Sequence, residues 1–192
     1  MVDHNMRSSR LDLQPLSLAH LQDFHAIMTD AVGLRFSTRK PFLSIEATKS
    51  LLEKWIYSPE KPWLDNHAIL LRSSGNEGEE SRMIGTVGVV RLPGDAFFDS
   101  AEIAYGIHSD FWGKGYASEA LGMFVGLYWT AGRDGVDVKN SLVASIDPEN
   151  KASERVVQKA GFRKREKMKD GYVRGGEGGE VSEQVWWVLE RP

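Results

Sequence analysis

The stretch that most constrains the fold of this chain is a glycine-containing turn between a predicted strand, Ala101 to His108, and a predicted helix, Gly115 to Thr130. Residues 111–118 read F-W-G-K-G-Y-A-S. Glycines at 113 and 115 allow the backbone to approach a ligand closely, and the first amides of a helix lie at the positive end of its dipole. The turn therefore fits a pyrophosphate site with Lys114 at its rim. A plain tight turn explains this pattern, taken alone, at least as well.

Two common nucleotide-binding motifs do not match this turn. A dinucleotide-binding G-x-G-x-x-G requires glycine at position 118, where the chain has Ser118. A P-loop requires serine or threonine directly after Gly-Lys, where the chain has Gly115. The turn is therefore neither a Rossmann fingerprint nor a P-loop.

The composition excludes several kinds of functional site and partner. Cysteine is absent from the 192 residues, which excludes disulfides, thiolate metal sites and a cysteine nucleophile. The formal net charge of −3 gives no basic excess that would indicate nucleic acid or an anionic membrane as the main partner, and no apolar run reaches the roughly 20 residues that a membrane-spanning helix needs. Residues 1–10 lack the apolar core of a secretory signal, and the five histidines show no metal-ligand spacing. We therefore expect a cytoplasmic, metal-free globular domain.

Hydrophobic periodicity predicts strands and helices of one mixed α/β domain. The predicted strands cover residues 11–16, 67–72, 83–91, 101–108, 141–146, 162–168 and 183–189, and the predicted helices cover residues 18–28, 44–56, 115–130 and 147–160. In the last helix, Asp147-Pro148 supplies an Asx cap and a first-turn proline, and Gly161 ends it. We expect a polar turn at residues 73–81, a flexible N-terminus at residues 1–9 and a mobile glycine-rich loop at residues 170–182.

Two segments resemble sequence motifs of the GCN5-related N-acetyltransferases (GNAT). Ala101 to Ala120 is similar to motif A of that family, and especially to the W-G-K-G-Y-A-x-E-A run of its RimJ/RimL branch. The family signature Q/R-x-x-G-x-G/A is met by Gly115 and Ala117, while Trp112 stands where Gln or Arg is usual. Asn150 to Phe162 resembles motif B, N-x-x-S-x-x-x-x-x-K-x-G-F.

This resemblance implies a single GNAT-like domain over residues 1–192, with a mixed, mostly antiparallel central sheet flanked by helices. Strands 101–108 and 141–146 would splay apart in that sheet. The implied activity is transfer of an acetyl group from acetyl-CoA to a primary amine, by direct attack in a ternary complex and without a metal. A catalytically silent acyl-CoA-binding regulatory module is the alternative, and a nucleotide-dependent enzyme that uses the glycine turn is a third reading.

The resemblance also implies roles for individual residues. Glu102 is the expected base, acting through water on the amine, and Ser153 is the expected donor to the leaving thiolate. The ordinary alternatives are a salt-bridged or solvated strand glutamate and a helix-start serine bonded to the local backbone. A backbone N–H near Ile107 would polarise the thioester carbonyl. The residues expected to bind the cosubstrate are Tyr105, Ile107, His108, Trp112, Gly113, Lys114, Gly115, Tyr116, Ala117, Ser118, Asn150 and Ser153.

The acceptor amine stays open at this level. Its specificity is expected to come from residues 18–56 and from the last hairpin, where the resemblance is weakest. A protein N-terminus and a small or antibiotic-like amine both fit, and the protein could be a monomer or a homodimer.

Overall fold

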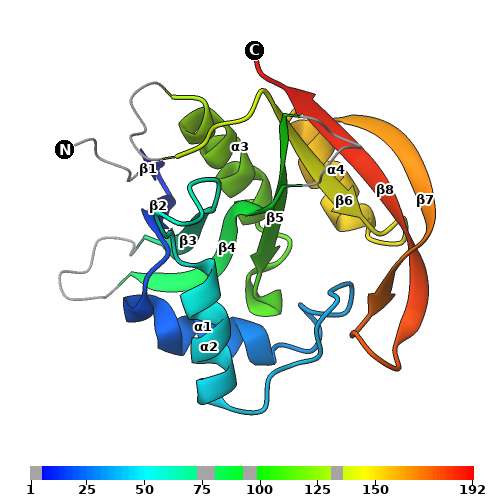
Figure 1. Cartoon of the computed structure of the whole chain (residues 1–192). Coiled ribbons are helices and arrows are strands. Elements are labelled where there is room, and N and C mark those ends of the chain that lie inside the picture. Colours follow the sequence, from blue (N-terminus) through cyan, green and yellow to red (C-terminus); the bar gives the residue numbers. More distant parts are fainter. Residues whose placement is uncertain (1–5, 73–80, 93–98, 131–135) are drawn as a thin grey trace.

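The computed structural model describes residues 6–72, 81–92, 99–130 and 136–192 (Figure 1). The strands are β1 (Met6–Arg7), β2 (Leu11–Pro15), β3 (Asp65–Leu71), β4 (Arg82–Arg91), β5 (Ser100–Ile107), β6 (Ser141–Ile146), β7 (Arg163–Arg174) and β8 (Glu180–Glu190). The helices are α1 (Leu21–Thr29), α2 (Ile45–Trp55), α3 (Tyr116–Tyr128) and α4 (Lys151–Lys159), with 3-10 turns η1 (Leu18–His20) and η3 (Ser109–Phe111). The expectations for residues 1–5 and 73–80 lie outside the described residues, and Met6–Arg7 form the edge strand β1.

The strands form one sheet in the order β1-β2-β3-β4-β5-β6-β8-β7. Every neighbouring pair is antiparallel except β5 and β6, which run parallel. The predicted mixed, mostly antiparallel sheet is therefore confirmed. Within the described ranges, no helix has the length and apolar character that a bilayer crossing requires.

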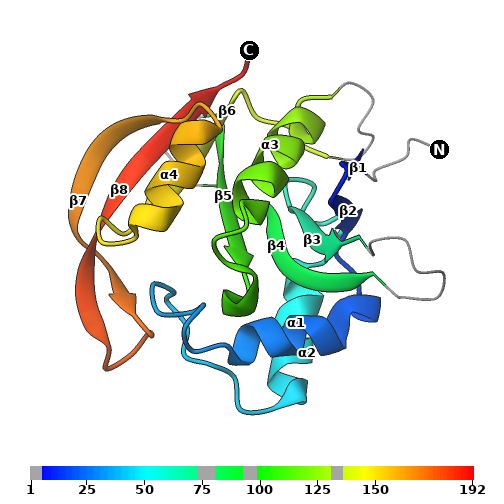
Figure 2. The same cartoon turned by 180° about the vertical axis from the view of Figure 1, so that it is seen from behind.

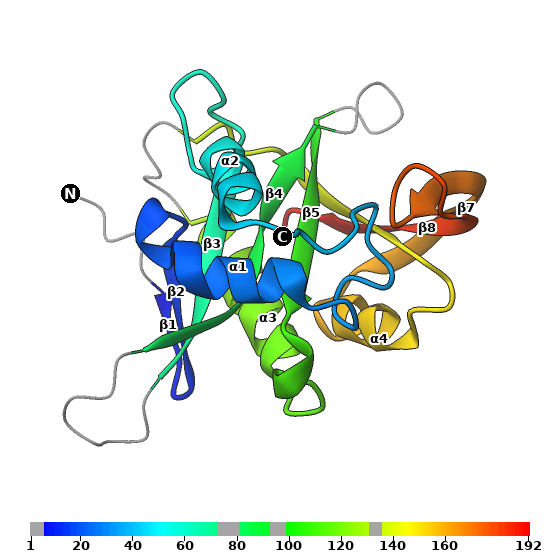
Figure 3. The ribbon, with the colours of Figure 1, turned by 90° about the horizontal axis from the view of Figure 1, so that it is seen from below.

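Each face of the sheet is covered by one pair of helices. Helices α1 and α2 lie on one face and α3 and α4 on the other (Figure 2), and Figure 3 shows the same layers from below. Alternation along the strands supplies both cores, because successive side chains point to opposite faces. Ile69 packs in the cluster that contains Phe124 of α3, while its neighbours Ala68 and Leu70 pack in the cluster that contains Phe24 of α1.

The start of α4 corrects one prediction. The helix begins at Lys151, and its N-cap is Asn150, whose side-chain oxygen accepts a hydrogen bond from the Ser153 amide at 3.1 Å. The only backbone amide that donates to the Asp147 carboxylate within the described residues is that of Glu149, in a turn that precedes the helix, and the other donors to this carboxylate are side chains. The predicted cap at Asp147 was therefore wrong.

The predicted mobile loop at residues 170–182 was also wrong over most of its length. Strand β7 continues to Arg174 and β8 begins at Glu180, with Val173 opposite Val181. The turn between them uses three glycines with positive φ: Gly175, Gly176 and Gly178. Glycine adopts that conformation without strain, so the cluster closes a hairpin.

Candidate functional site

The sheet opens between its two parallel strands. Strands β5 and β6 pair only from Ser100 opposite Ser141 to Glu102 opposite Val143. Beyond that point β5 stays with β4 as far as Ile107, and β6 stays with β8. Each strand follows its outer neighbour, so the two halves of the sheet diverge and leave the inner edge of β5 unpaired.

Backbone alternation identifies which groups face the gap. The His108 amide donates to the Ile84 carbonyl of β4 at 2.9 Å, so the backbone groups of the even-numbered residues of β5 point toward β4. The amides of Tyr105 and Ile107 therefore point toward the gap. The Ile107 carbonyl is already engaged, since it accepts from the Trp112 indole at 2.7 Å. The backbone amide of His108 is not available to a ligand, and only its side chain contributes to the site.

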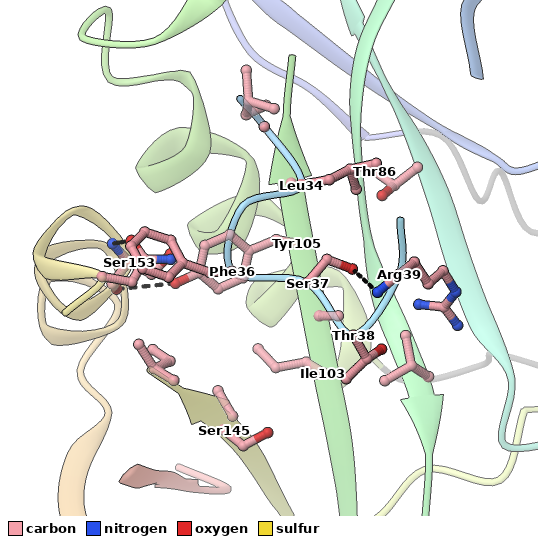
Figure 4. Close-up of a pocket in the computed structure, with 18 of the residues that line it drawn as sticks. Leu34, Phe36, Ser37, Thr38, Arg39, Thr86, Ile103, Tyr105, Ser145 and Ser153 are labelled. Carbon is pink, nitrogen blue, oxygen red and sulfur yellow. Dashed lines mark hydrogen bonds between the residues drawn. The ribbon is translucent and has the colours of Figure 1, made fainter. Parts of the chain in front are cut away.

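Tyr105 crosses the gap with its side chain. Its hydroxyl donates to the Ser153 carbonyl of α4 at 3.0 Å (Figure 4). Burial raises the pKa of this hydroxyl, which therefore stays protonated and remains a donor. The contact ties β5 to α4 across the opened sheet.

A cavity of about 430 Å³ lies at this opening. Strands β4, β5 and β6, helix α1, residues 33–39 and the start of α4 all contribute to its wall. Six of the sequence-predicted site residues line it: Glu102, Tyr105, Ile107, His108, Asn150 and Ser153. The other predicted residues, 112–118, form the turn beyond η3 and do not line this cavity.

The turn itself has the geometry of an anion site. Gly113 and Gly115 have φ of +75° and +81°, and Gly115 is the N-cap of α3. Within the described chain, no acceptor takes a hydrogen bond from the backbone amides of residues 113–118. Arg10 holds the turn from β2's side, since it donates to the Lys114 carbonyl at 2.9 Å and pairs with Glu119. The structure thus leaves a row of amides free at a helix N-terminus.

Glu102 is buried, with 4% of its surface exposed, and belongs to a polar cluster that sequence reasoning missed. Its carboxylate accepts a hydrogen bond from the Ser145 hydroxyl of β6 at 2.7 Å and forms an ion pair with Arg91 of β4. Ser145 lies four residues after Ser141 on the same face of β6, so strand alternation could have placed it in the site.

Asp30, which directly follows α1, adds a second carboxylate to the site at the start of η3. Asp30 accepts a hydrogen bond from the Ser109 amide at 2.7 Å, and its carboxylate lies 3.9 Å from His108 Nδ1. Burial acts to raise the pKa of Asp30, but the hydrogen bonds from the Ser109 and Gly33 amides outweigh it and hold the pKa below its ordinary value. Asp30 is therefore an ionised, fully engaged group that fixes the β5–α3 connection.

Asp147 organises the far wall of the cavity, and sequence reasoning also missed this role. Its carboxylate receives Arg174 through two nitrogens at 2.9 and 3.0 Å, the Ser182 hydroxyl at 2.8 Å, the Glu149 amide at 2.8 Å and the Tyr172 hydroxyl. Burial acts to raise the pKa of Asp147, yet these donors together lower it. Burial and the adjacent carboxylate raise the pKa of Tyr172 to about 12, so its hydroxyl stays a donor. The start of α4 is thereby fastened to the β7–β8 hairpin.

Sequence and structure comparisons place these features among known proteins. A family model described as acetyltransferase (GNAT) domain matches residues 10–163, which include both motif-like segments. RimL, a ribosomal L7/L12 alpha-N-protein acetyltransferase solved with coenzyme A, is 19% identical, with a TM-score of 0.77 over 96% of this chain and 96% of that chain. No curated protein sequence gives a significant match.

Two further solved structures share the fold. Ribosomal-protein-S5-alanine acetyltransferase from Vibrio fischeri is 15% identical, with a TM-score of 0.76 over 97% of this chain and 96% of that chain. Spermidine N-acetyltransferase from Vibrio cholerae, solved with CoA and spermine, is 14% identical, with a TM-score of 0.71 over 96% of this chain and 97% of that chain. At these identities the likeness concerns the fold, and it confirms the architecture expected from the two motifs.

Proposed function

Because the chain belongs to the GNAT acetyltransferase family, we propose that it is an acetyl-CoA-dependent N-acetyltransferase that modifies a primary amine. One observation carries the proposal: β5 and β6 separate after Glu102 beside a turn whose amides are free. A slot with unpaired backbone amides suits an extended ligand that carries amides at one end and phosphates at the other.

The cosubstrate would lie along β5 and the turn before α3. The amides of residues 113–118 would bind its pyrophosphate, with Lys114 and Ser118 at the edge of the same turn. The amides of Tyr105 and Ile107 face the gap, and the Ile107 amide would donate to the thioester carbonyl. A preorganised donor of this kind contributes about 3–4 kcal/mol to catalysis. When bound, acetyl-CoA supplies the activated acyl group.

Two residues of the chain would assist the proton transfer from the amine and the departure of the thiolate. Glu102 lines the cavity, and its carboxylate can take a proton from the amine through a water molecule. Ser153, at the start of α4, would stabilise the departing thiolate with its hydroxyl, while its backbone amide and carbonyl are used by Asn150 and Tyr105. In the transfer, a nitrogen–carbon bond replaces the carbon–sulfur bond of the thioester, and the amine gives up one proton. Since the chain has no cysteine, a cysteinyl acyl-enzyme is excluded and attack is direct.

A thermal-shift panel of acetyl-CoA, CoA, NAD and ATP tests the cosubstrate. At a hundredfold excess over Kd, a bound ligand stabilises the fold by about 2.7 kcal/mol, which corresponds to a rise in Tm of roughly 5–10 °C for a chain of this size. We expect acetyl-CoA and CoA to give this shift. A shift with NAD or ATP alone would overturn the proposal.

A CoA-thiol release assay with a panel of amines then separates an enzyme from a silent module. The proposal requires thiol release that depends on both acetyl-CoA and an amine, and that falls sharply in Glu102→Gln. Acetyl-CoA binding without thiol release from any amine would instead identify a regulatory acyl-CoA-binding module.

A further inference from the structure

One loop lines the cavity with positive charge. Residues 33–41 lie in the connection between α1 and α2, and the segment from Leu34 to Arg39 crosses in front of the opened sheet (Figure 4). Arg39 lines the main cavity and also an adjoining hollow, of about 550 Å³, whose wall includes Arg35 and Lys40. The loop therefore brings three cations to one entrance of the site.

The hairpin between β7 and β8 holds this loop in position. The Gly175 amide donates to the Ser37 carbonyl at 2.8 Å, and the Lys40 ammonium donates to the Glu177 carbonyl at 3.2 Å. Arg174 lies over the Phe36 ring, 5.3 Å from its centre. Contacts at residues 36, 37 and 40 therefore hold the segment that carries Arg39 and Lys40 against the hairpin.

The three cations have no carboxylate partner among the residues that the structure describes. Arg39 lies over the Trp55 ring at 5.3 Å, and Arg35 lies over the Phe36 ring at 4.8 Å and the Trp112 ring at 5.3 Å. Arg39 is partly buried, which lowers the pKa of its guanidinium, whereas Arg35 and Lys40 are exposed. Rings attract these cations but do not neutralise them.

The three acids that line the main cavity, in contrast, are already engaged. Glu102 is paired with Arg91, and Asp147 with Arg174. Asp30 accepts the Ser109 amide.

The adjoining hollow is lined by four cations, Arg35, Arg39, Lys40 and Arg174, and by two carboxylates, Glu149 and Glu180, which both pair with Arg174. The lining cations that have no carboxylate partner among the described residues therefore lie on the loop from α1 and not on the sheet.

Resting on the proposed function, we propose that the acceptor is a peptide or protein N-terminus with an acidic side chain close to the amine, whose carboxylate is bound by Arg39 with Arg35 or Lys40. Guanidinium groups bind carboxylates through paired hydrogen bonds, which suits Arg39 for this contact. A polycationic amine would be repelled by the same three side chains.

The positive charges of the loop also favour an α-amine as the nucleophile, through the pKa of the amine. An α-amino group has a pKa near 8, whereas an alkyl amine has a pKa above 10. Nearby guanidinium groups lower the pKa of an ammonium further, so a larger fraction of a bound α-amine is neutral and able to attack. Acceptor binding and nucleophile activation thus point to the same substrate class.

The test uses full-length protein, acetyl-CoA and three peptides that differ only at positions two to four. One carries acidic residues there, one carries their amides and one carries lysines, and spermidine serves as a fourth amine. We expect kcat/KM for the acidic peptide to exceed that of the amide peptide by about tenfold, the effect of one charge-assisted contact, and the ratio to shrink as ionic strength rises.

Arg39→Gln should remove most of this preference, mainly by raising KM for the acidic peptide. Lys54→Gln, an exposed charge on α2 that does not line either cavity, is the matched control and should leave the preference unchanged.

Two results would overturn the proposal: equal or better use of the lysine peptide or spermidine, or a preference for acid that survives in Arg39→Gln. Acetylation without acidic preference would leave the proposed function standing and refute only the acceptor class. Absence of thiol release with every amine would refute both.

Discussion

Truncation of the Asp147 side chain should loosen the β7–β8 hairpin from the segment that leads into α4. The side chain of Asp147 is nearly completely buried, with 1% of its surface exposed. Its carboxylate joins the segment before α4 to Arg174, Tyr172 and Ser182 of the hairpin. Asp147→Ala removes all of these contacts at once. Arg174 then keeps only Glu149 and Glu180, whose side chains are 68% and 73% exposed.

The expected loss of stability follows from this geometry. Removing one partner of a buried ion pair costs about 3–5 kcal/mol because a charge is left without compensation. Arg174 retains two exposed carboxylates, so the lower end, about 3 kcal/mol, applies here. For a chain of 192 residues, this lowers Tm by roughly 6–12 °C.

Urea and thermal unfolding of the variant, followed by circular dichroism, measure this loss. Asp147→Asn keeps the volume and one acceptor, and it should lose less than Asp147→Ala. Glu180→Gln alters an exposed partner of the same arginine and should change the free energy of unfolding by less than about 1 kcal/mol.

A second readout connects this contact to the site. Arg174 packs on Phe36, so a loosened hairpin should raise KM for the acceptor more than it changes the affinity for acetyl-CoA. A loss below about 1 kcal/mol in Asp147→Ala, or an unchanged acceptor KM, would refute the reasoning that this carboxylate holds the hairpin and the loop together.

Four further changes test other parts of the structure. Glu102→Gln should lower kcat by about 10²- to 10⁴-fold in the thiol-release assay, and an unchanged kcat would remove Glu102 as the base. Gly115→Val forces a side chain into φ +81°, which costs about 1–2 kcal/mol and should weaken acetyl-CoA binding in calorimetry. A Cβ at Gly85 would lie 2.2 Å from the Gly106 carbonyl, whereas one at Gly106 meets nothing within 4 Å, so only Gly85→Ala should lower Tm; equal melting would contradict this packing. Because the pKa of Asp147 is lowered on folding, its stabilisation is complete above the unfolded-state pKa and is lost as pH falls through the lower folded-state value; acid titration of stability should therefore be shallower in Asp147→Asn, and identical curves would count against the shift.

Much of the fold could be predicted from local signals. Hydrophobic alternation located β2 to β6 within a few residues, since each of these strands has one or two buried faces. Ser44, the first residue of the predicted helix 44–56, caps α2, and its hydroxyl accepts a hydrogen bond from the Ala47 amide. Gly161 ends α4 as predicted, with φ of +90°. These features depend on residues close together in the chain.

The half of the candidate site at which we propose that the cosubstrate binds was predictable for the same reason. Its turn, the edge of β5 and the start of α4 are contiguous segments, and each can be read from residue order. Gly113 and Gly115 have positive φ in the structure, a conformation that glycine adopts readily in a tight turn. The roles assigned to these residues stay predictions.

The hairpin was misread because glycine clusters have two physical meanings. Five glycines between residues 170 and 180 suggested a loop, but three of them adopt positive φ in one tight turn. The flanking residues pair, with Val173 opposite Val181. Composition cannot distinguish these cases, because strand pairing is a contact between two segments.

What the sequence by itself determined is therefore the order of elements and the backbone geometry of the turn that precedes α3. Only the tertiary structure decided which charges are neutralised and which face a ligand. Glu102 meets Arg91 and Ser145 across three strands, and Lys40 meets Glu177 from 137 residues away. The proposed acceptor side of the site depends on such long-range pairs, and they stabilise the protein only once the chain has paid the entropy of bringing them together.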